Sequence, residues 1–261
     1  LIMKKIKINK ILKKKGKTPL ICLTAYSKNI AKIADKYCDI ILVGDSLGMV
    51  LYGMKTTREV KIETMILHAI TVKNNTKNSL VVIDMPYKTY TNKFIAFKNA
   101  KRILNLTKCD AIKMEGGKEI VPIIKYLNKK GISVMGHVGL LPQTAVNFNV
   151  RGKNTIQKNK IFNDAMAISK SGAFAIIIEC VVESLAKIIT DNVKIPTIGI
   201  GASKFCDGQI LVTDDMLGLT DFNPKFVKKY KNLNKEIEKS IIKYSNDVKY
   251  SRFPSIKNTY R

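Results

Sequence analysis

The sequence lacks any apolar run long enough to cross a membrane. Its longest runs, such as Ala173 to Ile178, are far shorter than the roughly 20 residues that span a bilayer. The cationic N-terminal stretch also lacks the apolar core and the small-residue cleavage site of a secretory signal. We therefore expect no membrane partner and a cytoplasmic protein. Disorder is excluded as well, because 46% of the residues are hydrophobic.

Cysteine pairs at metal-binding or redox spacing are also absent. The chain has an odd number of widely spaced cysteines and no C-x-x-C pair; they are Cys22, Cys38, Cys109, Cys180 and Cys206. Such a set indicates neither a disulfide framework nor a zinc site. Some of them lie in or beside apolar runs, so we interpret them as small core residues in a reducing compartment.

Acidic residues are scarce. The chain has 20 Asp and Glu against 46 Lys and Arg, and its formal charge is +26 at pH 7. The basic residues are almost all lysines and are scattered, whereas phosphate recognition favours the arginine fork. We find no helix-turn-helix, zinc-finger spacing or aromatic RNA-binding box, so we expect no nucleic-acid partner. A basic nucleic-acid-binding protein stays open as an alternative, and steeply salt-dependent affinity would reveal it.

Short β-branched runs alternate with helix-like stretches, which is the pattern of a parallel α/β fold. The eight candidate strands are Leu20 to Thr24, Ile40 to Gly44, Leu80 to Asp84, Ala111 to Met114, Ser133 to His137, Ala175 to Glu179, Thr197 to Gly201 and Gln209 to Val212. Helical spacing marks Asn29 to Tyr37, Ile62 to Lys73, Ile95 to Thr107, Ile120 to Lys130, Ile161 to Ser171 and Ser184 to Ile189. The alternation predicts a single-domain (β/α)8 barrel of the TIM type.

Composition divides the chain into three parts. Residues 1–19 form a basic N-terminal segment, residues 20–219 hold the predicted catalytic barrel, and residues 220–261 are rich in lysine. Helical spacing in the last part runs from Phe226 to Val248. We expect closing helices and a polar C-terminal tail there, and no linker marks a second domain.

Polar residues sit where predicted strands end. They are Asp45, Asp84, Glu115, His137 and Glu179. The C-terminal ends of barrel strands converge on one face, where the active sites of this fold lie. A single acid at a strand end is more often a helix cap or a loop residue. Several in register predict a shared pocket.

Converging carboxylates repel one another unless a cation or a proton intervenes. Asp45, Asp84 and Glu115 are hard oxygen donors with no Cys or His pair at ligand spacing, which predicts Mg²⁺ rather than Zn²⁺. Lys113 lies two residues before Glu115, so both side chains share one strand face. We regard Lys113 as a candidate to bind a substrate carboxylate.

Glu179 ends the most apolar predicted strand. Apolar surroundings raise the pKa of a carboxylate, as a general base working near neutral pH needs. A carboxylate paired with a neighbouring lysine is the alternative, and spacing does not decide between them. His137 is a candidate to hydrogen-bond a substrate oxygen, whereas His68 lies in a helical stretch and is interpreted as structural.

At these residues the sequence resembles the ketopantoate hydroxymethyltransferase family. The matching motifs, in chain order, are LTAYS (23–27), DIILVGDSLGMVLYG (39–53), VVIDMPY (81–87), AIKMEGG (111–117), VMGHVGLLPQ (134–143), GAFAIIIECV (172–181), IPTIGIGA (195–202) and CDGQILV (206–212). The resemblance covers essentially the whole predicted barrel. It implies a Mg²⁺-dependent enzyme of pantothenate biosynthesis. Such an enzyme moves a one-carbon unit from 5,10-methylenetetrahydrofolate to 3-methyl-2-oxobutanoate and gives 2-dehydropantoate.

The resemblance also implies roles for individual residues. Asp45 and Asp84 would ligate the metal beside the substrate, and Glu115 would complete the metal shell. Ser46 and Lys113 would hold the 2-oxo acid. His137 would contact substrate or product, and Glu179 would accept the substrate proton. The family assembles as large homo-oligomers, often decamers, so we expect the same here.

Two places depart from the family pattern. The loop after Gln143 is shorter than usual and has Arg151 where a glutamine is common, and Ser203 replaces a glycine. We expect the first to affect closure over the substrate and the second to affect folate docking. A different Mg²⁺-dependent barrel enzyme for 2-oxo acids, a carbon-carbon lyase of the phosphoenolpyruvate-mutase type, stays open as an alternative. Such a lyase should have a catalytic cysteine loop.

Overall fold

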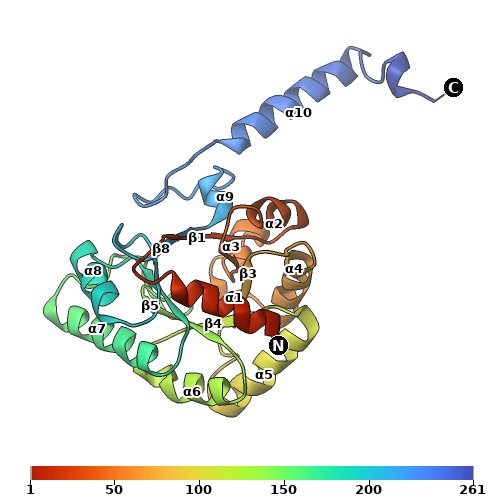
Figure 1. Ribbon diagram of the computed structural model, residues 1–261. Coiled ribbons are helices and arrows are strands. Elements are labelled where there is room, and N and C mark those ends of the chain that lie inside the picture. The colour runs from red at the N-terminus through yellow and green to blue at the C-terminus, as the bar shows by residue number, and fades with distance from the viewer. Residues whose placement is uncertain (1, 261) are drawn as a thin grey trace. The chain divides into compact units, whose positions relative to one another are not determined.

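Eight parallel strands close into a barrel in the computed structural model, which describes residues 2–260 and their side chains from Lys7 onward (Figure 1). Neighbouring strands follow chain order, and the last strand pairs with the first. The predicted (β/α)8 barrel is therefore confirmed, and all eight predicted strands are present. The strands are β1 (Leu20–Thr24), β2 (Ile40–Val43), β3 (Leu80–Asp84), β4 (Ala111–Glu115), β5 (Val134–Gly139), β6 (Ala175–Glu179), β7 (Thr197–Ile200) and β8 (Gly208–Leu211).

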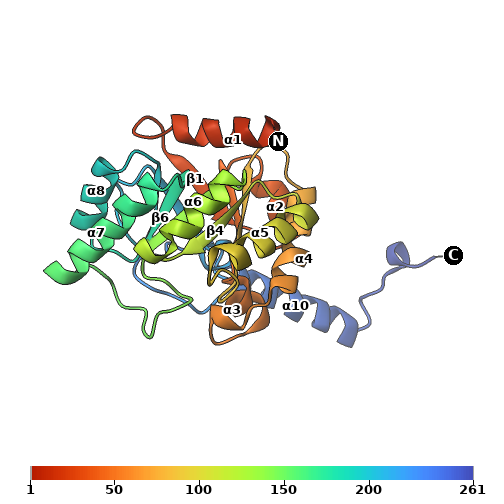
Figure 2. The same cartoon turned by 90° about the horizontal axis from the view of Figure 1, so that it is seen from below.

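Helices between the strands surround the barrel (Figure 2). They are α2 (Lys28–Ala34), α3 (Leu47–Tyr52), α4 (Ile62–Asn74), α5 (Lys93–Thr107), α6 (Val121–Lys129), α7 (Thr155–Lys170) and α8 (Glu183–Asn192), with short 3-10 helices η1 (Thr57–Glu59) and η2 (Lys118–Ile120). Each predicted helical segment overlaps one of them. Helix α7 begins earlier than predicted because the Asn154 side chain accepts a hydrogen bond from the Gln157 amide and caps it there.

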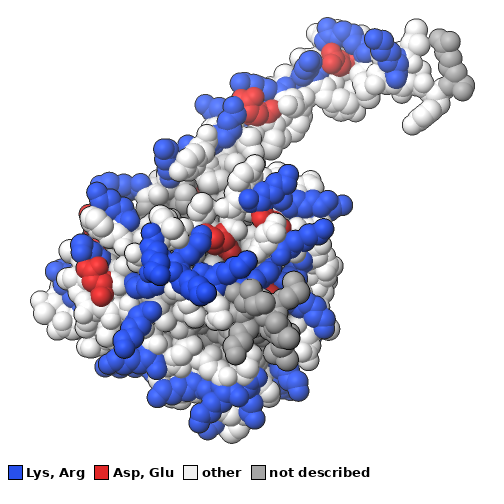
Figure 3. All heavy atoms as spheres, viewed as in Figure 1, with Lys and Arg blue, Asp and Glu red and all other residues white. Residues whose placement is uncertain are grey.

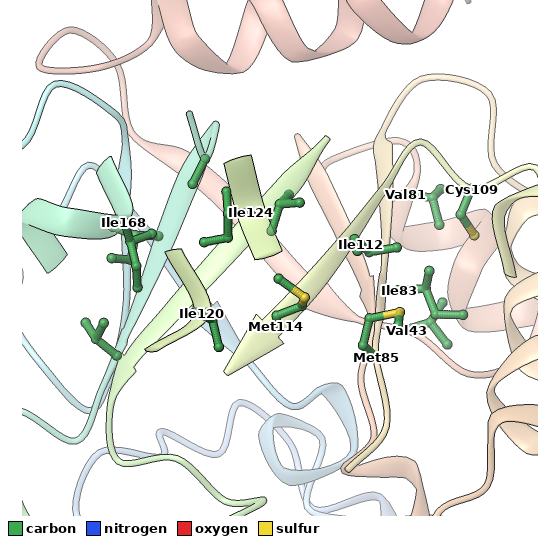
Figure 4. Close-up of a cluster of buried hydrophobic side chains, with 14 of the residues drawn as sticks. Val43, Val81, Ile83, Met85, Cys109, Ile112, Met114, Ile120, Ile124 and Ile168 are labelled. Atoms are coloured by element: carbon green, nitrogen blue, oxygen red, sulfur yellow. The ribbon is translucent and has the colours of Figure 1, made fainter. Parts of the chain in front are cut away.

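Alternation along each strand separates two layers of core. Outward side chains such as Ile83, Ile112 and Met114 pack under the helices in one large cluster (Figure 4). Inward side chains such as Leu80 and Val82 fill the barrel itself in a second cluster. The inward positions are apolar where the strands begin, so the barrel is packed shut below any site at the opposite end.

An additional helix lies in the basic N-terminal segment. Helix α1 (Ile2–Lys13) contributes Ile8 and Ile11 to the cluster inside the barrel, beside Leu20 at the start of β1. Lys15 beyond the helix pairs with Asp207 at 2.8 Å, just before β8. The segment therefore covers the end of the barrel where the strands begin (Figure 2).

The chain divides into two compact units, Leu1–Val212 and Thr213–Arg261. The second unit contains α9 (Thr213–Met216), α10 (Leu233–Lys249) and the 3-10 helix η3 (Ile256–Asn258). The helical spacing from Phe226 overestimated the last long helix, because residues 226–232 are not helical. The Asn232 side chain accepts a hydrogen bond from the Lys235 amide and sets the beginning of α10.

The surface and the cysteines agree with the composition. Lys and Arg side chains spread over the visible face with few acids between them (Figure 3). All five cysteines are buried and unpaired, as expected for small core residues. No helix in the described part of the chain has the length and apolar character needed to span a membrane.

Candidate active site

The inward positions change from apolar to polar at the C-terminal strand ends. On β4 the inward series runs Ala111, Lys113, Glu115, and on β3 it ends at Asp84. Asp84 pairs in register with Lys113, and Glu115 pairs with His137 on β5. The parallel register therefore brings these side chains to one level at one mouth of the barrel.

Asp45 and Ser46 reach the same mouth from the turn after β2. The backbone amide of Asp45 donates to Asp84 Oδ2 at 3.0 Å, which ties the end of β2 to the end of β3. The Ser46 hydroxyl lies 2.7 Å from the Tyr26 hydroxyl. His68 Nδ1 lies 2.7 Å from the Tyr26 carbonyl oxygen, so this second histidine supports the segment that follows β1.

Lys113 provides a buried positive charge among the carboxylates. Its Nζ lies 2.8 Å from Asp84 Oδ1 and 4.0 Å from Glu115 Oε1, and the side chain is only 5% exposed. Burial favours loss of the proton, but the charges of Asp84, Glu115 and Asp45 outweigh it and raise the pKa of Lys113. Lys113 is therefore a permanent cation at neutral pH.

His137 bridges two of the acids. Its Nε2 lies 3.2 Å from Glu179 Oε2, and its Nδ1 lies 3.6 Å from Glu115 Oε1. Burial and Lys113 act against protonation, but the two carboxylates outweigh them and raise the pKa of His137 to about 9. Burial acts against ionisation of Glu115, yet the close approach and charge of His137 and the charge of Lys113 hold its pKa below the usual value.

Glu179 is the most accessible acid of this group, with 17% of its side chain exposed. Its charged partner is His137. Among the described residues Glu179 forms no ion pair with a lysine, which was the alternative that the sequence left open. Cys180, directly after it, has a φ of 48°, and its amide donates to the Ile200 carbonyl at 2.9 Å. Gly139 has a φ of 98°, and a Cβ there would lie 2.3 Å from the Glu179 carbonyl oxygen. Only glycine lets β5 approach the end of β6 this closely.

Two polar residues at the mouth were not singled out by the sequence. Gln143 follows β5 and donates through Nε2 to Asp45 Oδ2 at 2.8 Å. Tyr90, in the loop after β3, donates to Gln143 Oε1 at 2.5 Å. Gln143 lies within the family-like motif VMGHVGLLPQ, but a polar residue after a strand is usually a solvated loop residue. Nothing in its spacing marked it as buried.

The donor set fits a hard divalent cation. Burial, together with the negative charges of Asp84 and Glu115, raises the pKa of Asp45 well above its usual value. A cation between Asp45 and Asp84 would remove that penalty. In the described part of the chain no group of three or more His, Cys, Asp or Glu side chains is arranged to hold a metal. Mg²⁺ does not need three, since it is usually held by one or two carboxylates with water and substrate.

The departures from the family pattern lie in two loops. Arg151 Nη2 donates to the Asn147 carbonyl at 2.7 Å and closes the loop that follows Gln143. The Arg151 amide donates to the Cys180 carbonyl, also at 2.7 Å, so this loop joins the chain just after Glu179. Ser203 Oγ accepts from the Phe205 amide in the turn after β7. Both residues shape backbone near the mouth of the barrel.

Comparison with solved structures shows the barrel in proteins of low sequence identity. A phosphonopyruvate hydrolase, solved with oxalate and Mg²⁺, superposes with a TM-score of 0.62 at 12% identity and covers 97% of this chain and 93% of its own. A 2,3-dimethylmalate lyase of the phosphoenolpyruvate mutase/isocitrate lyase superfamily gives a TM-score of 0.63 at 11% identity, covering 97% and 87%. At these identities the likeness concerns the fold alone.

Curated relatives are much more similar. The 3-methyl-2-oxobutanoate hydroxymethyltransferase of Pelagibacter ubique is 52% identical over 254 residues, which is 97% of this chain and 99% of the relative. The enzyme of the same name from Rhizobium etli is 49% identical and covers 95% of this chain and 92% of its own. The family model described as ketopantoate hydroxymethyltransferase matches residues 5–256. The ordered motifs, the barrel and these relatives together show that the chain belongs to the ketopantoate hydroxymethyltransferase family.

Proposed function

We propose that this chain transfers a one-carbon unit from 5,10-methylenetetrahydrofolate to C3 of 3-methyl-2-oxobutanoate and gives 2-dehydropantoate, a precursor in pantothenate biosynthesis. The observation that carries the proposal is the buried carboxylate cluster with Lys113 at one barrel mouth, next to the more accessible Glu179 and His137. The cluster suits a small 2-oxo acid, whose keto oxygen and carboxylate both interact favourably with cations. Glu179 suits the removal of a carbon-bound proton.

Asp45 and Asp84 are the residues we assign to Mg²⁺, with Glu115 behind them. Bound there, Mg²⁺ would polarise the keto and carboxylate oxygens of the 2-oxo acid and make its C3 proton more acidic. Both oxygens of Glu115 face protein groups, Oε2 the Gln143 amide at 3.0 Å and Oε1 His137. That arrangement supports contact of Glu115 with the metal through water.

The substrate carboxylate is assigned to the positive charge of Lys113 and the hydroxyl of Ser46. Lys113 is held on Asp84 and is shielded from water, so its attraction for an anion is little screened. Ser46 follows Asp45 directly and is positioned by Tyr26. Together they orient the acid so that C3 faces the accessible Glu179.

Glu179 accepts the C3 proton, and the imidazole of His137 stands beside it as a charged neighbour. The resulting carbon nucleophile attacks the methylene carbon carried by folate. Water supplies the hydroxyl oxygen as the two carbon–nitrogen bonds that hold this carbon on folate break. The proton taken from C3 and the second proton of water end on the two folate nitrogens, and tetrahydrofolate leaves. His137 Nε2, 3.2 Å from Glu179 Oε2, positions the carboxylate through this sequence.

The product assay tests the proposal directly. Purified enzyme is incubated with 3-methyl-2-oxobutanoate, 5,10-methylenetetrahydrofolate and Mg²⁺, with a parallel reaction in EDTA, and 2-dehydropantoate is quantified by mass spectrometry. We expect product only when metal is present. The lyase alternative is tested in the same experiment with 2,3-dimethylmalate, and cleavage of that acid without hydroxymethyl transfer would overturn the proposal.

The family resemblance also supports a cytoplasmic homo-oligomer, with a decamer as the expected assembly. Light scattering of the purified protein measures its mass in solution. A monomeric mass would contradict this part of the proposal without affecting the reaction.

A further inference from the structure

Gln143 is a buried residue whose side-chain amide and backbone N–H all have hydrogen-bond partners. The residue is 1% exposed. Nε2 donates to Asp45 Oδ2 at 2.8 Å and to the Met85 carbonyl at 2.9 Å. Its backbone amide donates to Glu115 Oε2 at 3.0 Å. Oε1 accepts from the Tyr90 hydroxyl at 2.5 Å.

These partners come from successive strand ends. Asp45 follows β2, Met85 follows β3, Glu115 ends β4, and Gln143 itself follows β5. One residue therefore connects the mouths of neighbouring strands from β2 to β5. The orientation of its side-chain amide is determined by these partners, because the Met85 carbonyl can only accept a hydrogen bond and must therefore face Nε2.

The uncharged amide matters at this position. A lysine in its place would neutralise Asp45 and compete with any cation for its carboxylate. An acid would add to the repulsion among the buried carboxylates. Glutamine holds Asp45 and Glu115 at fixed positions without altering the net charge of the cluster, and one oxygen of Asp45, Oδ1, has no described contact with it.

We propose that Gln143, held by Tyr90, is a positioning residue that fixes Asp45 and Glu115 for divalent-metal binding. The inference rests on the proposed function, because that function assigns the metal to these carboxylates. Gln143 does not touch the reacting atoms. It acts on affinity for the metal through the orientation of the two acids.

The test measures binding of Mn²⁺ alone, followed by loss of the EPR signal of the free hydrated ion. Mn²⁺ serves as the probe because it prefers the same oxygen ligands as Mg²⁺. Gln143→Met keeps the side-chain volume and the backbone amide but removes the amide group. We expect its dissociation constant for Mn²⁺ to rise by about 10- to 100-fold, the usual effect of losing an outer-shell partner. Tyr90→Phe removes the hydrogen bond to Gln143 Oε1 and the two 3.3 Å contacts of the Tyr90 hydroxyl with the Glu115 backbone, and it should raise the dissociation constant about fivefold.

Asn99→Leu is the matched control. Asn99 Nδ2 donates to the Thr89 carbonyl at 2.7 Å, so it anchors the same loop that carries Tyr90 but does not contact the acids. This variant should lower the melting temperature and leave Mn²⁺ affinity unchanged. Steady-state kinetics provide a second readout, since saturating Mg²⁺ should restore most of kcat in Gln143→Met if the defect is metal affinity.

The outcomes separate the two proposals. Wild-type affinity for Mn²⁺ in both Gln143→Met and Tyr90→Phe would overturn this inference while the proposed metal site stands. No Mn²⁺ binding by the wild type would overturn the metal site and this inference together. If Gln143→Met does not fold, the Tyr90→Phe result decides. If Asn99→Leu weakens Mn²⁺ binding as much as Tyr90→Phe does, anchoring of the loop alone explains the effect. That result would also overturn the inference.

Discussion

Lys113 Nζ lies 2.8 Å from Asp84 Oδ1, and the two residues are register partners on neighbouring strands of the barrel. Both side chains are almost fully removed from water. Each charge has lost its hydration, so each depends on the other. Removal of one partner from such a pair leaves an uncompensated charge in the protein interior.

Lys113→Met should therefore destabilise the protein strongly. We expect a loss of about 3 to 5 kcal/mol in the free energy of unfolding, measured by urea denaturation at pH 7. The control is Lys187→Met, which breaks the exposed pair with Asp191 at 2.7 Å. That variant should lose less than about 1 kcal/mol. Similar losses in the two variants would contradict the buried-pair argument.

Asp84→Asn should raise the Mg²⁺ concentration needed for activity. One proposed ligand loses its charge, so we expect the half-activating concentration to increase at least about tenfold. Asp110→Asn is the matched control, because Asp110 is also buried and bound to a lysine, Lys73, at 2.7 Å, but lies where β4 begins. An unchanged metal titration in Asp84→Asn would argue against ligation.

Glu179→Gln tests the proton transfer separately from the folate step. Wild-type enzyme with Mg²⁺ should exchange the C3 proton of 3-methyl-2-oxobutanoate for deuterium in D₂O without folate. In the variant the rate of this exchange should fall by about 10²-fold or more, the usual effect of removing a general base. NMR of the substrate measures the rate. The control is Glu183→Gln, in the exposed first turn of α8, which should exchange the proton at the wild-type rate. A near-normal exchange rate in Glu179→Gln would exclude the proposed role of Glu179.

Gly139→Ala should disturb the end of β6. The new Cβ would lie 2.3 Å from the Glu179 carbonyl oxygen, and the φ of 98° is strained for any residue with a side chain. We expect a loss of about 3 kcal/mol or more together with reduced turnover. Gly16→Ala carries a positive φ of 64° but meets no atom within 4 Å. It should lose only about 1 to 2 kcal/mol and keep its turnover, and an equal effect at both sites would rule out the contact argument.

Asp35 makes stability depend on pH. Burial raises the pKa of its carboxyl, but hydrogen bonds from the amides of Ser79, Lys77 and Asn78 outweigh burial and lower the pKa below the ordinary 3.8. A lowered folded-state pKa stabilises the fold above pH 3.8, and the contribution disappears as the pH falls through the folded-state value.

The comparison with Asp35→Asn measures this contribution. At pH 7 the wild type should be more stable by about 1 to 3 kcal/mol, the range for hydrogen bonds to a charged group. The difference should shrink when urea denaturation is repeated below pH 3.8. A difference that stays constant from pH 7 to pH 3 would show that the charge of Asp35 contributes nothing.

The barrel and most of its mouth were predictable because their signals are local. A strand with a strict inward and outward alternation fixes where Asp84, Lys113 and Glu115 point, and strand order then places them together. The closeness of His137 to Glu179 required the register of β5 against β6, which the sequence alone does not contain.

Other features depended on contacts that no local pattern reveals. Gln143 is buried only because Tyr90, Asp45 and Glu115 surround it, and those residues are far apart in the sequence. Helix α1 lies in a stretch dominated by lysine, and it is its position over the barrel that buries Ile8 and Ile11. The non-helical start of the predicted last helix, residues 226–232, reflects capping by Asn232, which helical spacing cannot detect.

The pairing of β1 with β8 has a consequence for the newly made chain. Leu20 finds its partner Gly208 only after the ribosome has synthesised nearly the whole barrel unit. Until then β1 presents an unpaired edge, and the apolar residues that line the barrel remain open to other chains. The barrel cannot close during most of its own translation, so until β8 has been synthesised the nascent chain depends on protection of that edge rather than on the stability of the finished fold.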